Sequence, residues 1–179
     1  DVLCSDKTGT LTQDKIILEK YVDLNGEESK EVLSYAYLNS FYQTGLKNLL
    51  DRAILDHGDQ NYDNFLDKKY KKIDEIPFDF NRRRMSVALE DSDKKTHLLI
   101  CKGAIEEMLA ISDKALIKGN LVELKDDKRK QLSSLANSFS KDGFRVIAVA
   151  IKEVDNNKFQ YCVNDEQEMV LVGFMAFLD

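Results

Sequence analysis

The sequence predicts an α+β fold, an antiparallel β-sheet flanked by helices, on three observations. Three stretches between residues 71 and 102 alternate apolar and polar side chains, and polar turns separate them, which is typical of an antiparallel meander. Apolar residues recur at helical spacing both before and after this meander. Strand-like apolar stretches stand at both ends of the chain. Because similar elements far apart in sequence often pair, we expect the two ends to share the sheet of a second domain, into which the α+β body is inserted.

The first third of the chain is expected to hold two strands and two helices. Residues 1–5 are expected to form a short buried strand that presents Asp6 at its end, and residues 15–23 a second extended stretch. A helix follows from Ser29, which is a favourable cap before an acidic first turn. A second helix is expected at 46–58, where a glycine ends it.

The rest of the chain alternates between strands and helices. A lysine-rich surface loop with a short helical turn, at 62–72, leads into the meander. The predicted strands of the meander are 71–78, 84–90 and 96–102. A helix follows Gly103 directly, and its early glutamates suit the positive end of the helix dipole. The remaining elements are a hairpin at 117–124, an amphipathic helix at 125–143 and strands at 144–154 and 169–178.

Composition limits the classes of function. The net charge of −6 speaks against nonspecific binding to nucleic acid or to an anionic membrane. The three cysteines are odd in number and far apart, so they indicate neither a disulfide framework nor a paired metal site. The longest apolar run, residues 169–178, is about half of the ~18 residues that a membrane-spanning helix needs. We therefore expect an excised segment of a larger protein, itself not embedded in a membrane.

One carboxylate, that of Asp6, has the surroundings of a nucleophile for phosphoryl transfer. It stands at a predicted strand end and is followed by Lys7 and a tight Thr-Gly-Thr turn. Amide N–H groups of such a turn bind phosphate oxygens, a lysine offsets their charge, and the carboxylate attacks to form an acyl phosphate. A Mg²⁺ ion would be needed to screen the two anions. The alternative is an ordinary turn in which Asp6 and Thr8 cap the local backbone.

The stretch "DKTGTLT", residues 6–12, resembles the phosphorylation signature of the P-type ATPases, ion pumps that pass through an aspartyl phosphate. The resemblance implies that ATP phosphorylates Asp6 and that the main-chain carbonyl of Thr8 helps to bind Mg²⁺. It also implies that Lys7 and Thr10 lie in the phosphate site. The candidate catalytic residues are therefore Asp6, Lys7 and Thr8, with Asp6 and Thr8 as metal ligands.

Two stretches with a basic residue resemble segments of the nucleotide-binding domain of these pumps. "KGAIEEML", residues 102–109, implies that Lys102 and Gly103 lie at the adenine and ribose pocket. A glycine there lets a ligand approach closely and the ammonium group attracts it, although a Lys-Gly pair at a strand end is also typical of a simple turn. "GFRVIAVA", residues 143–150, implies that Arg145 contacts a phosphate group of the nucleotide.

Two further stretches resemble adenine-contacting segments of the same domain. "IPFDFNRRRMSV", residues 76–87, implies that Phe78 stacks on adenine and Arg83 contacts the nucleotide, with Arg82 and Arg84 as close competitors. The alternatives are a core position for Phe78 and a solvated edge strand for the arginines. "LLDRAIL", residues 49–55, points more loosely to Asp51 near the adenine amino group, and the alternative for Asp51 is a surface charge.

The resemblance divides the chain into three parts. Residues 1–15 and 169–179 are predicted to be pieces of a Rossmann-like phosphorylation domain, the second as its returning hinge strand, and residues 16–168 the nucleotide-binding domain. The stretches "TGLKNLLDRAIL", "PFDFNRRRMSV" and "CKGAIEEML" look most like bacterial magnesium-transporting P-type ATPases. The resemblance implies ATP and Mg²⁺ as cofactors and a place on the cytoplasmic side of the cell membrane. The implied partners are the phosphorylation, actuator and transmembrane domains of the same pump.

Two later segments of the family's catalytic centre, T-G-D and G-D-G-x-N-D, do not occur in these 179 residues. We therefore predict that the chain binds ATP weakly but neither phosphorylates itself nor hydrolyses ATP. Two other functions stay open. A phosphatase of the haloacid-dehalogenase type shares the aspartate nucleophile but usually carries a second aspartate two residues on, where this chain has Thr8. A non-catalytic interaction module would keep the motifs only as remnants.

Histidine and cysteine chemistry is not expected to contribute. His57, beside the glycine that ends its helix, is expected to act as a C-terminal cap, and His97 to lie on the surface of its strand. Cys101 is expected to be a small buried hydrophobic residue.

Overall fold

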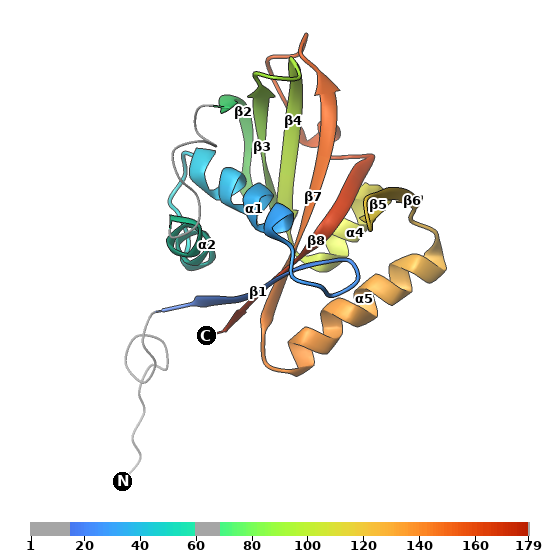
Figure 1. Cartoon of the computed structure of the whole chain (residues 1–179). Coiled ribbons are helices and arrows are strands. Elements are labelled where there is room, and N and C mark those ends of the chain that lie inside the picture. Colours follow the sequence, from blue (N-terminus) through green and yellow to red (C-terminus); the bar gives the residue numbers. More distant parts are fainter. Residues whose placement is uncertain (1–14, 60–68, 179) are drawn as a thin grey trace.

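The computed structural model describes residues 15–59 and 69–178, and within them eight strands form one sheet covered by helices (Figure 1). The strands are β1 (Ile17–Asp23), β2 (Tyr70–Asp79), β3 (Arg84–Asp91), β4 (Thr96–Gly103), β5 (Ser112–Ile117), β6 (Asn120–Glu123), β7 (Arg145–Asp155) and β8 (Met169–Leu178). The helices are α1 (Lys30–Tyr42), α2 (Leu49–Asp59), α4 (Ile105–Ile111) and α5 (Asp126–Lys141), with a short 3-10 turn, η1, at Val163–Asp165. The predicted α+β class is confirmed.

The predicted meander is confirmed as well. β2 pairs with β3 and β3 pairs with β4, both antiparallel. The register of β3 and β4 is unbroken from Arg84 opposite Gly103 to Asp91 opposite Thr96. By contrast, the register of β2 shifts between Ile76 and Asp79, at the end where the hairpin turns. This pairing sets the turn of the β2–β3 hairpin beside the last residues of β4.

The C-terminal strand β8 lies in the interior of the sheet. The strand order is β2-β3-β4-β7-β8-β5-β6, and β1 pairs with β8 as well. Along one side of β8 runs β7, while β5 and β1 share the other side, β5 near Met169 and β1 near Leu178. The β5–β8 pair is parallel, and the other pairs among the described strands are antiparallel. The residues predicted to form a hinge strand therefore also build the middle of this sheet. The boundary at residue 169 stays a prediction, and residues 1–5 lie outside the described part.

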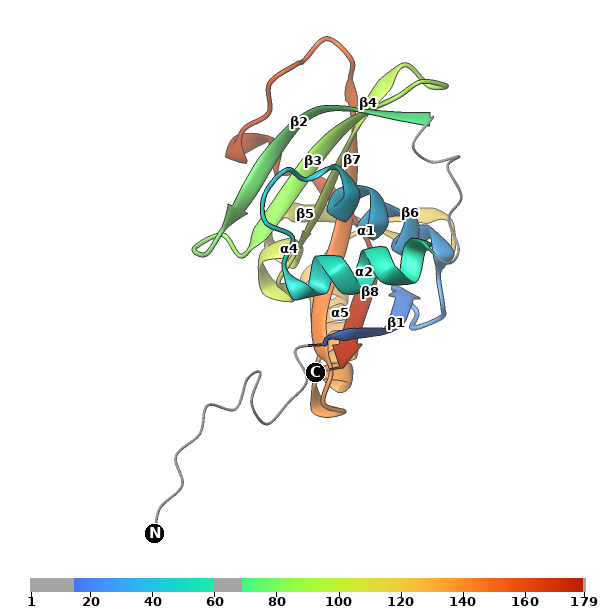
Figure 2. The ribbon, with the colours of Figure 1, turned by 90° about the vertical axis from the view of Figure 1, so that its left-hand side faces the viewer.

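Both faces of the sheet are buried. Helices α1 and α2 lie against one face, and α4 and α5 against the other, as the two views show together (Figures 1 and 2). Neighbouring side chains of β3 point to opposite faces: Val87 packs in the core beneath α1, and Ala88 in the core beneath α4 and α5. Cys101 on β4 is fully buried in the second core, as predicted, and burial raises the pKa of its thiol to about 12. Coverage on both sides explains why β3 and β4 are almost continuously buried, polar residues such as Ser86 and His97 included.

Local signals place the ends of the helices. Ser29 caps α1, since its hydroxyl oxygen accepts a hydrogen bond from the Val32 amide at 3.4 Å. After α5 the chain turns at Gly143, whose φ of +91° lies in the left-handed region that glycine tolerates. No helix in the described part of the chain is both long and apolar enough to cross a lipid bilayer.

The predicted surface position of His97 is wrong. His97 lies on β4 and is almost fully buried, with its Nδ1 atom 2.8 Å from the hydroxyl oxygen of Tyr161. Tyr161 comes from the segment between β7 and β8, and its backbone amide donates a hydrogen bond to Asp74 Oδ2 at 2.6 Å. The segment between β7 and β8 thus buries His97. The period-two pattern within β4 cannot predict this burial, because Tyr161 lies 64 residues further along the chain.

Candidate functional site

The largest group of predicted site residues lies around one pocket of about 510 Å³. The pocket is formed by the turn of the β2–β3 hairpin, the start of α2, the end of β4 and the start of β7. Its lining includes all six residues predicted to bind nucleotide: Asp51, Phe78, Arg83, Lys102, Gly103 and Arg145. Other lining residues, which the sequence did not single out, are Asn48, Leu50, Phe80, Met85, Ala104, Val146 and Ile147. Segments that are distant in sequence therefore meet at a single site.

The floor of the pocket is a buried ion pair. Lys102, on β4, is 6% exposed, and Asp51, in the first turn of α2, is 1% exposed. The Lys102 ammonium group donates hydrogen bonds to Asp51 Oδ1 and, at 2.5 Å, to the hydroxyl oxygen of Ser40 on α1. The Ser40 hydroxyl in turn donates to Asp51 Oδ1 at 3.1 Å. The alternative that Asp51 is a surface charge is therefore wrong.

Asp51 also starts its own helix. The Asn48 amide donates to Asp51 Oδ2 at 3.2 Å, and the Asp51 amide donates to Asn48 Oδ1 at 2.9 Å. Each of the two side chains thus satisfies a backbone donor near the beginning of α2. One carboxylate therefore serves both the helix start and the ion pair, which fixes the position of α2 relative to β4.

Burial and charge act together on the two ionised groups of the floor. Burial alone would raise the pKa of Asp51, but the charge and hydrogen bond of Lys102 outweigh it and hold that pKa below its ordinary value of 3.8. Burial lowers the pKa of Lys102, and the carboxylate of Asp51 offsets only part of this effect. Asp51 is thus ionised at neutral pH because Lys102 is beside it, and loss of either partner would leave a polar group buried without its counterpart.

The position of Gly103 has no room for a side chain, because the backbone of the β2–β3 hairpin packs directly against it. A Cβ atom at this position would lie 2.5 Å from Arg84 Cβ and 2.6 Å from the Arg83 carbonyl oxygen. The same carbonyl accepts a hydrogen bond from the Ala104 amide at 3.0 Å. From the sequence we attributed this glycine to close approach of a ligand, whereas in the structure the hairpin backbone itself needs the space.

The mouth of the pocket carries two exposed phenylalanine rings. Phe78 and Phe80 are 49% and 89% exposed, and their centroids lie 5.3 Å apart with the planes at 86°. The alternative that Phe78 is a core residue is therefore wrong. Phe80 was missed, although residues two apart on an extended strand lie on the same side, so the spacing of the two rings in "PFDF" could have revealed it.

The structure separates the three consecutive arginines. Arg83 lines the pocket, is half exposed, and forms ion pairs with Glu106 and Glu107 at 3.1 and 2.5 Å. The hydrogen bonds that Arg83 donates, first to Glu107 and then to Glu106, raise the pKa of Arg83. Arg82 and Arg84 do not line the pocket and instead bind a buried carboxylate elsewhere, at distances of 2.6 and 2.8 Å. Of the three, Arg83 is the arginine that a ligand in the pocket can reach.

Cations outnumber carboxylates among the lining residues although the chain is acidic. The lining holds the cations Arg83, Lys102 and Arg145 against the single carboxylate of Asp51, in a chain whose net charge is −6. Arg145 lies at the exposed start of β7. Asp51 offsets the charge of Lys102, and Glu106 and Glu107 beside the pocket offset that of Arg83. The cationic side chains and the exposed aromatic rings suit a ligand with a flat ring and an anionic group.

Asp6, Lys7, Thr8 and Thr10 lie outside the described residues. Their predicted roles in phosphorylation and Mg²⁺ binding stay predictions. Within residues 15–59 and 69–178, no group of three His, Cys, Asp or Glu side chains is arranged to hold a metal ion.

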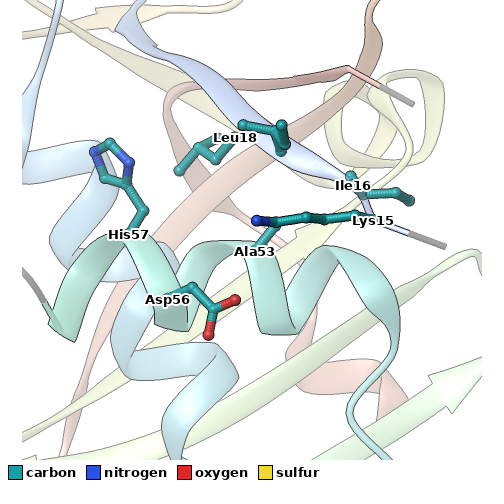
Figure 3. Close-up of a pocket in the computed structure, with 7 residues that line it drawn as sticks. Lys15, Ile16, Leu18, Ala53, Asp56 and His57 are labelled. Carbon is teal, nitrogen blue, oxygen red and sulfur yellow. The ribbon is translucent and has the colours of Figure 1, made fainter. Parts of the chain in front are cut away.

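A second pocket, of about 480 Å³, lies between the start of β1 and α2 (Figure 3). Its polar lining consists of Lys15 from the β1 side and of Asp56 and His57 from α2. The His57 ring, in the last turn of α2, also lies 5.2 Å from the ring of Tyr21. None of the predicted site residues lines this pocket.

The fold, the clustered motif residues and the pocket agree with one family, and the chain belongs to it. Residues 16–179 match the family described as "P-type ATPase, cytoplasmic domain N". This match covers both cores of the sheet and every residue of the first pocket.

Several curated proteins are similar over the whole chain. The "Magnesium-transporting ATPase, P-type 1" of Salmonella typhimurium (strain LT2) is 46% identical over 179 residues, which are 100% of this chain and 20% of that protein. The protein of the same name from Escherichia coli (strain K12) has the same identity and coverage. The "Calcium-transporting ATPase 1" of Lactococcus lactis is 28% identical over 195 aligned residues, 99% of this chain and 22% of that protein. The chain thus spans about a fifth of the length of these relatives.

Proposed function

We propose that the first pocket binds ATP and is the nucleotide site of a cation pump. One observation carries this proposal: six residues that motifs assigned separately, from Asp51 to Arg145, line a single pocket. The volume of about 510 Å³ falls within the range of roughly 300–1,000 Å³ typical of small-molecule sites. The family match to a cytoplasmic domain N supports the proposal.

The chemistry of the lining suggests how ATP lies. The adenine ring would pack against the exposed face of Phe78, with Phe80 as a second aromatic wall, because both rings present apolar surface to water that a base can cover. Arg83 and Arg145 would contact phosphate oxygens. Lys102, held at the floor by Asp51, would keep a fixed positive charge near the base and ribose.

In the intact pump this domain would deliver the γ-phosphate of ATP to Asp6, with Mg²⁺ bound at Asp6 and Thr8. Binding energy from the distant adenine would then serve to position the reacting phosphate. The transported cation would be magnesium, since the relatives at 46% identity are named as magnesium-transporting ATPases. The partners would be the phosphorylation, actuator and transmembrane domains of the same pump, with this domain on the cytoplasmic side of the cell membrane.

The domain division belongs to the same proposal. Residues 1–15 and 169–179 would connect to the phosphorylation domain, and residues 16–168 would form the nucleotide-binding domain. Arg145, on β7, lies opposite Phe177 near the C-terminal end of β8. A movement of the C-terminal connection would therefore be passed from β8 to β7 at Arg145. The two alternative functions, a phosphatase fragment and a non-catalytic module, gain no support from the family match, which is to an ATPase domain.

Thermal unfolding of the 179-residue chain with three ligands tests the proposal. ATP is expected to raise the melting temperature in proportion to the logarithm of its concentration, while adenosine and inorganic triphosphate, each with half of the contacts, raise it less. ATP turnover by the same chain is expected to be absent. An equal effect of triphosphate and ATP would contradict adenine recognition, and turnover would contradict the prediction that this chain is inactive alone.

A further inference from the structure

A buried carboxylate outside both pockets described above binds the hairpin turn that carries the mouth of the first pocket. Glu166 follows η1 in the segment between β7 and β8, and it is 0% exposed. Its Oε2 atom accepts hydrogen bonds from Arg82 Nη1 at 2.6 Å and from Arg84 Nε at 2.8 Å. Its Oε1 atom accepts a hydrogen bond from the Ser86 hydroxyl at 2.7 Å. One side chain thus makes three hydrogen bonds to the β2–β3 hairpin, two of them charge-assisted.

Through Arg82 this contact reaches both sides of the turn. The second guanidinium nitrogen of Arg82, Nη2, donates a hydrogen bond to the Pro77 carbonyl at 2.6 Å, directly before Phe78. Glu166 therefore holds the outgoing strand at Arg84 and Ser86, and by way of Arg82 also the incoming strand at Pro77.

The turn itself has a strained but well-supported backbone. Arg83 has a φ of +46°, in the left-handed region that non-glycine residues rarely adopt. Asp79 Oδ1 supports this shape by accepting hydrogen bonds from the amides of Asn81 at 2.7 Å and Arg82 at 3.0 Å. Because Arg82 and Arg84 are held by Glu166, the side chain of Arg83 between them is left to face Glu106, Glu107 and the pocket.

The segment that carries Glu166 is anchored independently of the turn. The Tyr161 amide donates a hydrogen bond to Asp74 Oδ2 at 2.6 Å, and the Lys152 ammonium group donates to the Gln167 carbonyl at 2.8 Å. The segment that carries Glu166 is thus anchored to β2 through Asp74 and to β7 through Lys152, and from there Glu166 holds the turn.

We infer that Glu166 is a positioning residue of the nucleotide pocket, which acts through Arg82 and Arg84 to hold Phe78 and Arg83 at the pocket mouth. This inference rests on the proposed nucleotide site. Its physical basis is that two guanidinium groups without their shared carboxylate would turn toward water and release the hairpin end. If Phe78 or Arg83 were displaced from the pocket mouth, its contact with the nucleotide would weaken and the affinity would fall.

Glu166→Gln in the ¹⁵N-labelled 179-residue chain tests the inference, because glutamine keeps the shape and removes the charge. Without ATP, the amide signals of residues 78–84 are expected to shift, which shows a changed turn in a folded chain. The Kd for ATP is expected to rise about tenfold, as a loss of positioning rather than of direct contact. Arg82→Lys is a milder variant for the case that Glu166→Gln does not fold. It keeps the charge but replaces the two separate nitrogens that bind Glu166 and Pro77 by a single one, and it is expected to raise the Kd severalfold.

Asp165→Asn is the matched control. Asp165 is the neighbour of Glu166, pairs with Lys158 and accepts a hydrogen bond from the Cys162 amide at 2.7 Å, but has no contact with the turn. It is expected to leave the Kd for ATP within about twofold of the wild type, even if the segment loosens.

The outcomes separate the two proposals. A wild-type chain with no response to ATP would overturn the proposed function, and the inference with it. ATP binding by the wild type with an unchanged Kd in both Glu166→Gln and Arg82→Lys would overturn the inference alone. An equal rise in Kd for Asp165→Asn would also overturn it, because general loosening of the segment would then explain the effect.

Discussion

The floor and the mouth of the pocket are built in opposite ways. At the floor, Lys102 and Asp51 are almost fully buried and tie β4 to α2. At the mouth, Phe78, Phe80 and Arg83 are about half exposed or more, and Arg83 pairs with Glu106 and Glu107 at the start of α4. A floor residue therefore supports both folding and binding, whereas a mouth residue is available for binding alone. Substitutions in the two regions should affect stability very differently even where they weaken the same ligand.

Lys102→Ala should show the largest loss of stability. It leaves the Asp51 carboxylate buried without its partner, and breaking a buried ion pair costs about 3–5 kcal/mol. Urea unfolding should show this decrease in the free energy of unfolding. The double variant Lys102→Met, Asp51→Leu should recover only part of the loss: apolar residues of similar size need no ionic partner, but the Asn48 amide and the Ser40 hydroxyl lose their acceptor. A single variant as stable as the wild type would show that the floor does not support folding.

Gly103→Ala should come next. The added methyl group would lie within 2.6 Å of the hairpin backbone and the Arg84 side chain, so the hairpin end must move, at a cost of about 1–3 kcal/mol. Urea unfolding measures the cost, and Ala104→Gly, which adds no atom and keeps the amide that donates to the Arg83 carbonyl, serves as a neighbouring control. An unchanged free energy of unfolding would mean that the approach of β3 to β4 is looser than the structure shows.

Acid should weaken the floor in a defined range of pH. The pKa of Asp51 in the folded chain lies below its ordinary value of 3.8, so the stability from this group is fully present above pH 3.8 and is lost as the pH falls through the folded pKa. The difference in free energy of unfolding between the wild type and Asp51→Asn should therefore be constant near neutral pH and shrink below pH 3.8. A difference that shrinks instead above pH 5 would contradict the depressed pKa.

Phe78→Ala should separate binding from folding. Because Phe78 is half exposed, its loss should change the free energy of unfolding by less than about 0.5 kcal/mol. The Kd for ATP should rise about tenfold or more, since stacking of an aromatic ring on a base contributes ~1–3 kcal/mol. Urea unfolding and an ATP titration give the two values, and Phe78→Tyr, which keeps a ring, should bind nearly as the wild type does.

Arg83→Gln should have the smallest effect on stability, with little change in the urea midpoint, because Arg83 and Glu106 are exposed to solvent and Glu107 is only partly buried. Its ATP affinity should nevertheless fall, and the remaining binding should depend less on salt than in the wild type, since a screened phosphate contact is lost. Arg84→Gln should instead lower the urea midpoint, because it removes one of the two guanidinium partners of the buried Glu166. Equal midpoints for the two variants would contradict the separation of the arginines.

Local structure was largely within reach of the sequence. The Ser29 cap, the meander and the end of α5 at Gly143 follow from short-range patterns, which depend on neighbouring residues. The central place of β8 did not follow, because its partners β1, β5 and β7 are set by pairing between distant segments. His97 was misplaced for the same reason, since Tyr161 covers it from another part of the chain.

For the site, motifs named residues but not their contacts. The six candidate residues do meet in one pocket, yet the Lys102–Asp51 pair was not expected, because it joins residues from two separate motifs. The choice among the three arginines also needed the structure, since only the position of Glu166 shows which of them are occupied elsewhere. Phe80 was missed as well, although its spacing from Phe78 could have indicated a common side.

The most direct test of the nucleotide site is a titration of the ¹⁵N-labelled chain with ATP, with Phe78→Ala alongside. The predicted result is a set of amide shifts concentrated at Asp51, Phe78, Lys102 and Arg145, and strongly reduced in the folded variant. An absence of shifts at millimolar ATP, or shifts concentrated at the second pocket around Lys15 and His57, would contradict the assignment.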